Sequence, residues 1–211
     1  MPNWVDNALT IQGTDEEMAR FAEQASRTYT AKYTDFSNGE PSMREEQVEA
    51  EFSFWNFVRP DDSILEEYWG QSPRHTDLAT AMRHEGNHWY DWNIKNWGCK
   101  WDASEPHLEE SVGELRYWFN TPWGPPVEAL EAMNKQYPTL VLTMRSLEEQ
   151  GWGVEYIADQ DGVRVIEEWD TPDTHEDSMK HKGWCNCEEM GDDEMEWMYE
   201  DCPKKKELAN A

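Results

Sequence analysis

Basic residues are scarce in this chain. Its 18 lysines and arginines stand against 45 aspartates and glutamates, which gives a formal net charge of -27. Nucleic acids and anionic membranes carry charge of the same sign, so direct binding to either is disfavoured. A basic protein is the partner that this charge favours. Because self-repulsion destabilises a compact acidic protein, the excess charge suggests a use that offsets its cost.

Long apolar runs and cysteines are also scarce. No stretch approaches the roughly 20 apolar residues of a membrane span, so we expect no membrane partner. The first residues lack the basic and apolar regions of a signal peptide. Without an export signal, the four cysteines are expected to be reduced thiols or metal ligands rather than disulfides. The expected compartment is the cytoplasm of a bacterial host.

Aromatic residues, in contrast, are plentiful. They make up 13% of the chain and include 13 tryptophans, whereas acidic disordered chains are poor in aromatics. With 211 residues the chain is long enough for one good-sized domain with additional elements. The composition therefore predicts a folded core with a highly acidic surface.

Residues 89–102 organise the chain, because four tryptophans fall within thirteen residues there. Trp89, Trp92 and Asn96 are spaced three and four apart, which predicts one face of a helix. Gly98 is the expected stop just past the helix end. The alternation that follows predicts a strand over residues 99–103. We expect the rings of Trp97 and Trp101 to be largely buried at this helix–strand junction.

The rest of the chain reads as alternating strands and helices. A strand over residues 4–11 is followed by a helix that Thr14 caps, with Glu17 completing a capping box. Residues 105–110 read as an acidic loop and residues 114–121 as a strand. The further predictions are a buried strand at 51–58, a short helix near 62–68, a helix opened by Asp77, a helix from Pro125 to Tyr137, and strands at 139–147, 154–158 and 163–169.

This order contains a βαββαβ unit, which is the ferredoxin-like pattern. The predicted fold is therefore α+β: an antiparallel sheet with helices on one face and extra C-terminal strands. We expect one domain over residues 1–170, with an insertion at about residues 28–75 packed on it. Residues 171–211 form an acidic tail that contains cysteine and histidine.

Four sequence stretches resemble the YubB/Api-like family of phage and plasmid proteins. They are WYDW at 89–92 with NWGCKWD at 96–102, MPNWVDN at 1–7, FNTPWGPP at 119–126 and EEQGWG at 148–153, and they occur in the family's order. The resemblance covers roughly residues 1–25 and 80–158. It implies a ferredoxin-like α+β domain and an origin in a mobile genetic element, and it implies no reaction or catalytic residues.

One motif points to an enzyme. His84, Glu85 and His88 match the His-Glu-x-x-His pattern of zinc peptidases, in which both histidines lie one helical turn apart and the glutamate is the general base. Gly86 and Asn87 are poor helix formers within the motif. So short a motif is most often a chance match, and no persuasive third ligand follows it.

A second group points to a metal. His175, His181, Cys185 and Cys187 lie in an otherwise unstructured tail, together with Cys202. Four such ligands could close a structural zinc site and hold together a tail too acidic to fold alone. The Cys-x-Cys spacing is tighter than usual, and the alternative is an accidental cluster of free thiols.

The acidic residues themselves form the third candidate site. A charge run is usually a solvated face, but carboxylates on a rigid surface can also imitate the phosphates of nucleic acid. The residues that we expect to contact a partner lie in one run that holds no base: Glu188, Glu189, Asp192, Asp193, Glu194, Glu196, Glu200 and Asp201. The face of the sheet is a second candidate patch.

The interpretation that these features favour is a non-enzymatic phage-type protein. It would bind and inhibit a basic, nucleic-acid-handling host or defence protein, as anti-CRISPR, anti-restriction and DNA-mimic proteins do. The alternative from another class is a metal-dependent hydrolase that uses His84, Glu85 and His88. A third alternative is an accessory phage protein whose charge serves solubility alone.

Overall fold

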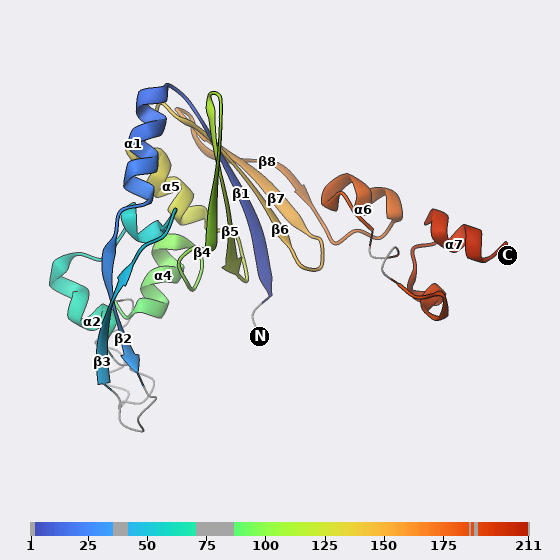
Figure 1. The fold of residues 1–211 in the computed structure, drawn as a ribbon, viewed down its shortest axis with the longest axis horizontal. Coiled ribbons are helices and arrows are strands. Elements are labelled where there is room, and N and C mark those ends of the chain that lie inside the picture. The colour runs from blue at the N-terminus through green and yellow to red at the C-terminus, as the bar shows by residue number, and fades with distance from the viewer. Residues whose placement is uncertain (1–2, 36–41, 71–86, 186, 188–189, 211) are drawn as a thin grey trace.

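The computed structural model describes residues 3–35, 42–70, 87–185, 187 and 190–210. Its main body is a six-stranded sheet in the order β4-β5-β1-β6-β7-β8, in which all neighbours are antiparallel (Figure 1). The strands are β1 Trp4–Gln12, β4 Ser104–Ser111, β5 Glu114–Pro122, β6 Val141–Glu148, β7 Gly153–Asp159 and β8 Gly162–Trp169.

The predicted ferredoxin-like fold is confirmed. Helix α1 (Asp15–Ala25) follows β1, and helix α5 (Val127–Gln136) joins β5 to β6, which gives the βαββαβ unit. Within that unit the spatial order β4-β5-β1-β6 places its first and third strands at the centre. Strands β7 and β8 then extend the sheet beyond β6 as consecutive hairpins, as the sequence predicts.

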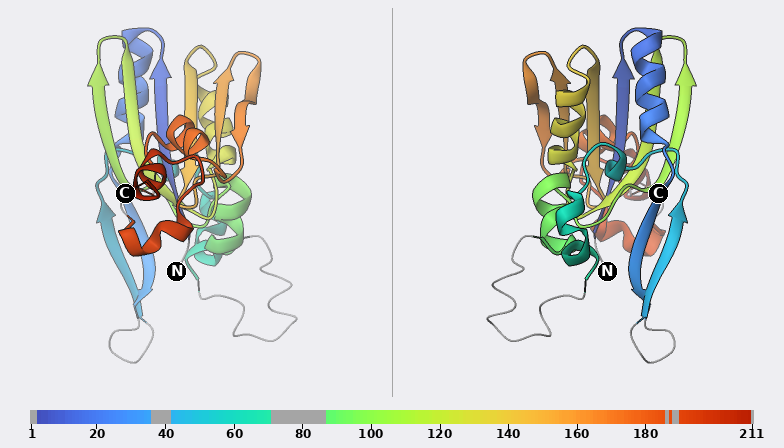
Figure 2. Two further views of the ribbon diagram at one scale, coloured as in Figure 1. Left: turned by 90° about the vertical axis from the view of Figure 1, so that its right-hand side faces the viewer. Right: turned by 90° about the vertical axis from the view of Figure 1, so that its left-hand side faces the viewer.

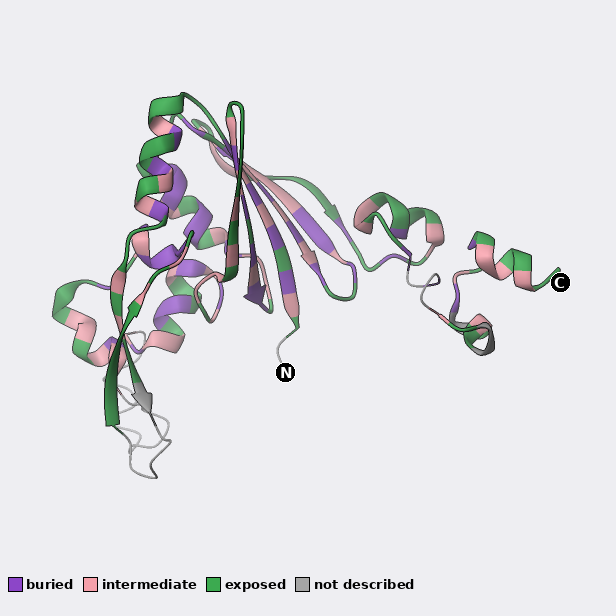
Figure 3. Ribbon diagram, viewed as in Figure 1, coloured by how far each residue is buried: buried purple, intermediate pink, exposed green. Residues whose placement is uncertain are grey.

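The core lies between one face of the sheet and the helices. Val5, Leu9 and Ile11 alternate along β1 and are fully buried, because every second side chain of a strand points to the same face. Helices α1 and α5 cover that face and contribute Phe21 and Leu130 (Figures 1 and 3). The N-cap of α1 is confirmed, since the Thr14 hydroxyl accepts a hydrogen bond from the Glu17 amide.

The described residues of the insertion contribute Phe52, Phe54 and Trp55 to the main core, but their internal structure differs from the prediction. The insertion contains a two-stranded hairpin of β2 (Tyr29–Asp35) and β3 (Ser42–Val48), then η1 (Phe54–Asn56), η2 (Asp62–Ile64) and α2 (Leu65–Trp69). The predicted strand over residues 51–58 is wrong, because the chain there turns into the 3₁₀ helix η1. Phe52 nevertheless enters the core and stacks on Phe119 of β5.

The tryptophan-rich stretch is partly as predicted. Helix α4 spans Trp89–Trp97 and ends at Gly98, whose φ of 86° belongs to the left-handed region that glycine tolerates. The predicted strand at 99–103 is wrong, because those residues are irregular and β4 begins at Ser104. The predicted acidic loop at 105–110 is also wrong, because those residues belong to β4. Trp97 is buried, but the expected burial of Trp101 is also wrong: 38% of that residue is exposed.

Candidate metal centre in the C-terminal module

The chain beyond β8 folds into a compact unit, which we call the C-terminal module (the described residues from 171 onward). It contains α6 (His175–Lys182), η5 (Asp192–Trp197) and α7 (Pro203–Leu208), so the tail is not otherwise unstructured. Figures 1 and 2 place the module on the side of the sheet opposite α1 and α5. Its cysteines form a buried cluster with Met198, separate from the main core.

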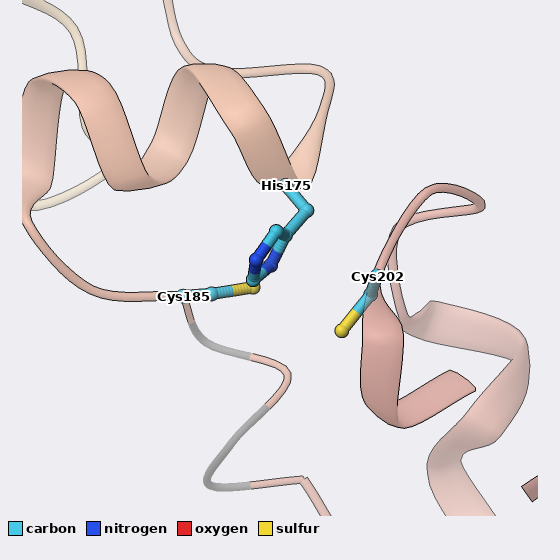
Figure 4. A group of neighbouring side chains, drawn as sticks. All are labelled: His175, Cys185 and Cys202. Carbon is cyan, nitrogen blue, oxygen red and sulfur yellow. The ribbon is translucent and has the colours of Figure 1, made fainter. Parts of the chain in front are cut away.

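Three side chains converge inside this module. One ligand atom each of His175, Cys185 and Cys202 lies within 4.8 Å of the other two (Figure 4). His175 opens α6, Cys185 follows the glycine turn after α6, and Cys202 is the N-cap of α7. The three ligands therefore come from three separate segments of the module.

His175 is held in place by Asp201, the neighbour of a second ligand. The Asp201 carboxylate accepts hydrogen bonds from the backbone amides of His175, at 2.7 Å, and Glu176, at 3.1 Å. These contacts satisfy two free amides at the start of α6 and connect this helix to the segment that carries Cys202. The His175 Nδ1 atom is buried and has no hydrogen-bond partner among the described residues. A metal ion would satisfy this nitrogen.

The surroundings of Cys202 lower the pKa of its thiol. Burial opposes its ionisation, but the backbone amides of Lys205 and Lys204 and the thiols of Cys187 and Cys185 together hold the pKa of Cys202 below its usual value. Burial raises the pKa of Cys185 to about 11. A bound cation would counter that effect, because a coordinated thiol loses its proton.

Cys187 supplies the fourth candidate ligand. It is buried, and its thiol interacts with those of Cys185 and Cys202. Its sulfur also accepts a hydrogen bond from the Tyr199 amide at 3.2 Å. Three cysteines and one histidine match the donor set of a closed, tetrahedral structural zinc site. The donor types in the module thus suit Zn²⁺, and three of these residues, His175, Cys185 and Cys202, form the group whose ligand atoms converge.

His181, which the sequence predicts to be a metal ligand, lies outside the group formed by His175, Cys185 and Cys202. Its imidazole stacks on Trp169 at the end of β8, with ring centroids 4.7 Å apart and an interplanar angle of 14°. Arg145 of β6 donates a hydrogen bond to the His181 carbonyl and packs its guanidinium over the Trp169 ring. Lys180 adds an ion pair with Glu167 at 3.0 Å. The structure therefore places His181 in the contact between the module and the sheet, and it brings Cys202 rather than His181 close to His175 and Cys185.

The acids predicted to contact a partner fall into three groups. Glu188 and Glu189 lie outside the described residues, as do the side chains of Asp192 and Asp193. Glu194, Glu196 and Glu200 are exposed, and Glu200 forms an ion pair with Lys205 at 2.6 Å. The carboxylate of Asp201 is already hydrogen-bonded to the backbone at the start of α6. Of the described acids in the run, three are therefore available at the surface.

On the open face of the sheet, ion pairs offset part of the acidic charge. Arg116 forms an ion pair with Glu114 at 2.8 Å, and Arg164 forms one with Asp159 at the same distance. Each of these arginines thus neutralises one acid of the sheet. In the C-terminal module, by contrast, residues 171–211 contain 12 acids and 5 bases.

The described part of the peptidase-type motif does not support a zinc peptidase site. His84 and Glu85 lie outside the described residues. His88 is buried and is the N-cap of α4, with extended backbone angles. The helix begins after the motif, so His88 is not in the helical turn that the paired-histidine geometry needs.

Comparison with known proteins agrees with the fold. Residues 96–185 match the family described as "Ferredoxin-like domain in Api92-like protein", which confirms the resemblance to Api-like proteins. That description names a fold and no reaction. Among solved structures, protein api92 from Yersinia pseudotuberculosis aligns with 9% identity and a TM-score of 0.48, over 82% of this chain and 99% of that chain. No curated protein matches the chain.

Within the described part of the chain, no helix is both long enough and apolar enough to span a membrane.

Proposed function

We propose that this protein is a non-catalytic inhibitor from a phage or plasmid that binds a basic, nucleic-acid-handling protein of its bacterial host. Its C-terminal module is folded around a zinc ion and presents carboxylates to that partner. The target class includes CRISPR effectors and restriction enzymes, whose nucleic-acid channels are basic. The protein acts in the host cytoplasm and makes no direct contact with nucleic acid.

The observation that carries this proposal is the pairing of a metal-ligand cluster with exposed acids in one small module. His175, Cys185 and Cys202 converge to 4.8 Å in a unit whose surface carries Glu194 and Glu196. A unit this small and this acidic has too little core to offset its own repulsion, so a metal ion would supply the missing stability. Carboxylates on a metal-stabilised frame keep fixed spacings, which a flexible acidic tail does not.

The overall charge supports the same function through association kinetics. A net charge of -27 far exceeds the roughly 2–8 charges that a small domain needs for solubility. Complementary charge accelerates encounter with a basic partner and selects against acidic ones. Ions screen such attraction beyond about 10 Å at 0.1 M salt. Binding should therefore be fast at low salt and should weaken steeply as salt rises.

The test uses tagged full-length protein incubated with host lysate at low and high salt. We expect one basic nucleic-acid-handling protein to be retained at low salt and released at high salt, and its purified form to bind with the same salt dependence. Retention of no such protein, or binding that does not respond to salt, would argue for the accessory role.

Charge-reversal variants localise the contact. Glu194, Glu196 and Glu200 are changed together to lysine in one protein. The matched control changes Glu23, Glu46 and Glu110, three exposed acids outside the C-terminal module, to lysine. Both variants gain the same net charge, so a uniform field effect would weaken binding equally. We expect the module variant to lose at least tenfold more affinity than the control.

A further inference from the structure

A second site lies far from the metal centre, where the insertion meets helix α4. The cavity there has a volume of about 210 Å³. Drug-sized ligands occupy pockets of about 300–1,000 Å³, so this cavity suits only a small group. Its walls come from β2, η1, α2, α4 and the loop after α4, and they are mainly aromatic: Tyr29, Trp55, Tyr68, Trp69, Trp89 and Trp101.

The rings form a connected cluster rather than isolated contacts. Trp55 lies at its centre, stacked on Tyr29 at 5.2 Å and packed against Trp69 at 5.2 Å and Tyr68 at 5.5 Å. Aromatic faces carry negative charge density, so a cavity walled by several rings attracts a cation. The same region already holds one cation: the Lys100 Nζ atom is 4.5 Å from the centroid of Trp101 and 5.9 Å from that of Trp89.

The side chain of Asp102 adds a carboxyl group to the wall of the cavity. Asp102 lines it and forms no ion pair with any basic side chain among the described residues. Burial raises its pKa, whereas hydrogen bonds from neighbouring donors favour the ionised form. The donors are the Tyr29 and Ser53 hydroxyls and the amides of Phe54, Trp55 and Ala103. The carboxyl group is thus surrounded by donors of the protein and has no basic partner among the described residues.

The hydrogen-bonding groups around the cavity are already engaged with one another. The Tyr68 hydroxyl donates to Asn93 Oδ1 at 2.8 Å, and Asn93 Nδ2 donates to the Lys100 carbonyl at 2.8 Å. Both oxygens of Asp102 accept the bonds described above. An ammonium or guanidinium group brings three to five N–H donors that would find few acceptors here, and unmet buried donors weaken binding. A methylated ammonium brings positive charge without those donors.

We propose that this aromatic cavity binds a methylated ammonium group, carried by a small molecule such as choline or by a methylated lysine of another protein. The rings supply cation–π attraction, and Asp102 supplies the opposing charge through its protein-solvated carboxylate. The site does not depend on the metal centre or on the acidic surface of the C-terminal module. It could therefore operate whether or not that module binds a basic protein.

The test compares two ligands of the same shape on the unaltered full-length protein. Choline carries the charge, and 3,3-dimethylbutan-1-ol replaces its nitrogen with carbon. Binding is followed by tryptophan fluorescence and by chemical-shift changes of the indole N–H groups. We expect saturable binding of choline with at least tenfold higher affinity than the neutral alcohol. No saturable choline binding, or equal binding of both ligands, would overturn the proposal.

Variants then locate the binding site. Trp69→Leu removes one wall of the cavity, whereas Trp118→Leu removes an exposed ring on β5 that does not line it. With both variants shown to be folded by circular dichroism, Trp69→Leu should lose at least tenfold in choline affinity and Trp118→Leu should lose none. Equal affinities in the two variants would contradict a site in this cavity.

A further titration, with peptides, distinguishes the two sources of the methylated ammonium group. The same protein is titrated with a trimethyllysine peptide and with its unmethylated counterpart. Preference for the trimethyllysine peptide over choline supports a protein partner, and preference for choline supports a small molecule. Tighter binding of the unmethylated peptide than of either methylated ligand would contradict the proposed selectivity.

Discussion

The carboxylate of Asp102 accepts a hydrogen bond from the backbone amide of Phe54 at 2.6 Å, although 48 residues separate the two in sequence. The same carboxylate accepts the Ser53 hydroxyl at 2.6 Å and the Ala103 amide at 2.7 Å. One buried side chain thus joins the start of η1 in the insertion to the loop between α4 and β4. This contact fixes the two segments that frame the aromatic cavity.

Replacing Asp102 with asparagine should therefore destabilise the protein strongly. The amide keeps one acceptor oxygen but turns an NH₂ group toward donors that have lost their partner. We expect the free energy of unfolding in urea to fall by about 3 kcal/mol or more, because hydrogen bonds to a charged group and unmet buried donors are both involved. Tyr29→Phe removes a single longer bond and should cost only about 1 kcal/mol. Equal losses would show that the carboxylate is not the shared anchor.

Trp97 and Trp101 should differ sharply in their contribution to stability. Trp97 is 3% exposed, and its indole donates a hydrogen bond to the Val58 carbonyl at 2.9 Å. Truncation of a buried tryptophan to alanine costs about 3–5 kcal/mol, so Trp97→Ala should fall in this range. Trp101 is 38% exposed, and its truncation should cost roughly 1–2 kcal/mol because less apolar area leaves contact. Chemical unfolding of both variants measures the difference.

The β7–β8 hairpin should show a defined sensitivity to acid. Two hydrogen bonds of 2.8 Å from Arg164, one of 2.9 Å from the Asp161 amide and the nearby charge of Arg164 hold the pKa of Asp159 to about 2. The pKa of an aspartate in an unfolded chain is about 3.9. A depressed folded pKa contributes stability above the unfolded pKa, and that contribution is lost as pH falls through the folded pKa.

The free energies of unfolding of wild type and Asp159→Asn, measured from pH 6 to roughly pH 2, test this pH dependence. Wild type should be more stable than the variant at pH 6, and the gap should close progressively between roughly pH 4 and pH 2. A gap that stays constant over this interval would mean that Asp159 contributes no pH-dependent stability.

The metal centre predicts different outcomes for two histidines six residues apart. His175→Phe should abolish bound zinc, because it removes a ligand of the cluster. His181→Phe should retain about one zinc per chain, because phenylalanine preserves the stacking on Trp169 and His181 is not a ligand. Metal analysis of the purified proteins makes the comparison. If His181→Phe lost the metal and His175→Phe kept it, the ligand set would be wrong.

Removing the metal should expose the module to proteolysis. Chelation of wild-type protein should open sites beyond residue 171 while the sheet stays protected, since three of the four buried residues in the module's hydrophobic cluster are cysteines. Cys202→Ser should show the same cleavage pattern without chelator. An unchanged pattern in both cases would leave the cysteines as free thiols in a self-supporting fold.

The parts of the fold that sequence predicts well are those encoded by local patterns. Alternation along β1 and β5, the cap at Thr14 and the stop at Gly98 each depend on residues a few positions apart. The β2–β3 hairpin was not predicted, because β3 is almost wholly exposed and buries no face that would impose a two-residue period. The irregular segment at residues 99–103 was misread because its short alternation serves the Asp102 contacts rather than a strand.

The candidate sites depend more on tertiary structure, which explains what sequence could not supply. The cysteines and histidines of the tail indicate a metal site from sequence alone. Only the folded module shows that Cys202, rather than His181, lies beside His175 and Cys185. Pro203, directly after Cys202, is a helix-start signal that favours an ordered position for this thiol. The aromatic cavity combines segments from residue 29 to residue 102, and no spacing rule brings these together.

The most direct test of the proposed function is competition on the basic partner. The partner is loaded with labelled nucleic acid, and the full-length protein is added at increasing concentration while release is measured. We expect mutual exclusion, with the apparent affinity of each ligand falling as the other is added. The variant with lysine at positions 194, 196 and 200 should displace nucleic acid more weakly than its control. If nucleic acid and the protein bind the partner together with undiminished affinities, occupation of the nucleic-acid channel is contradicted.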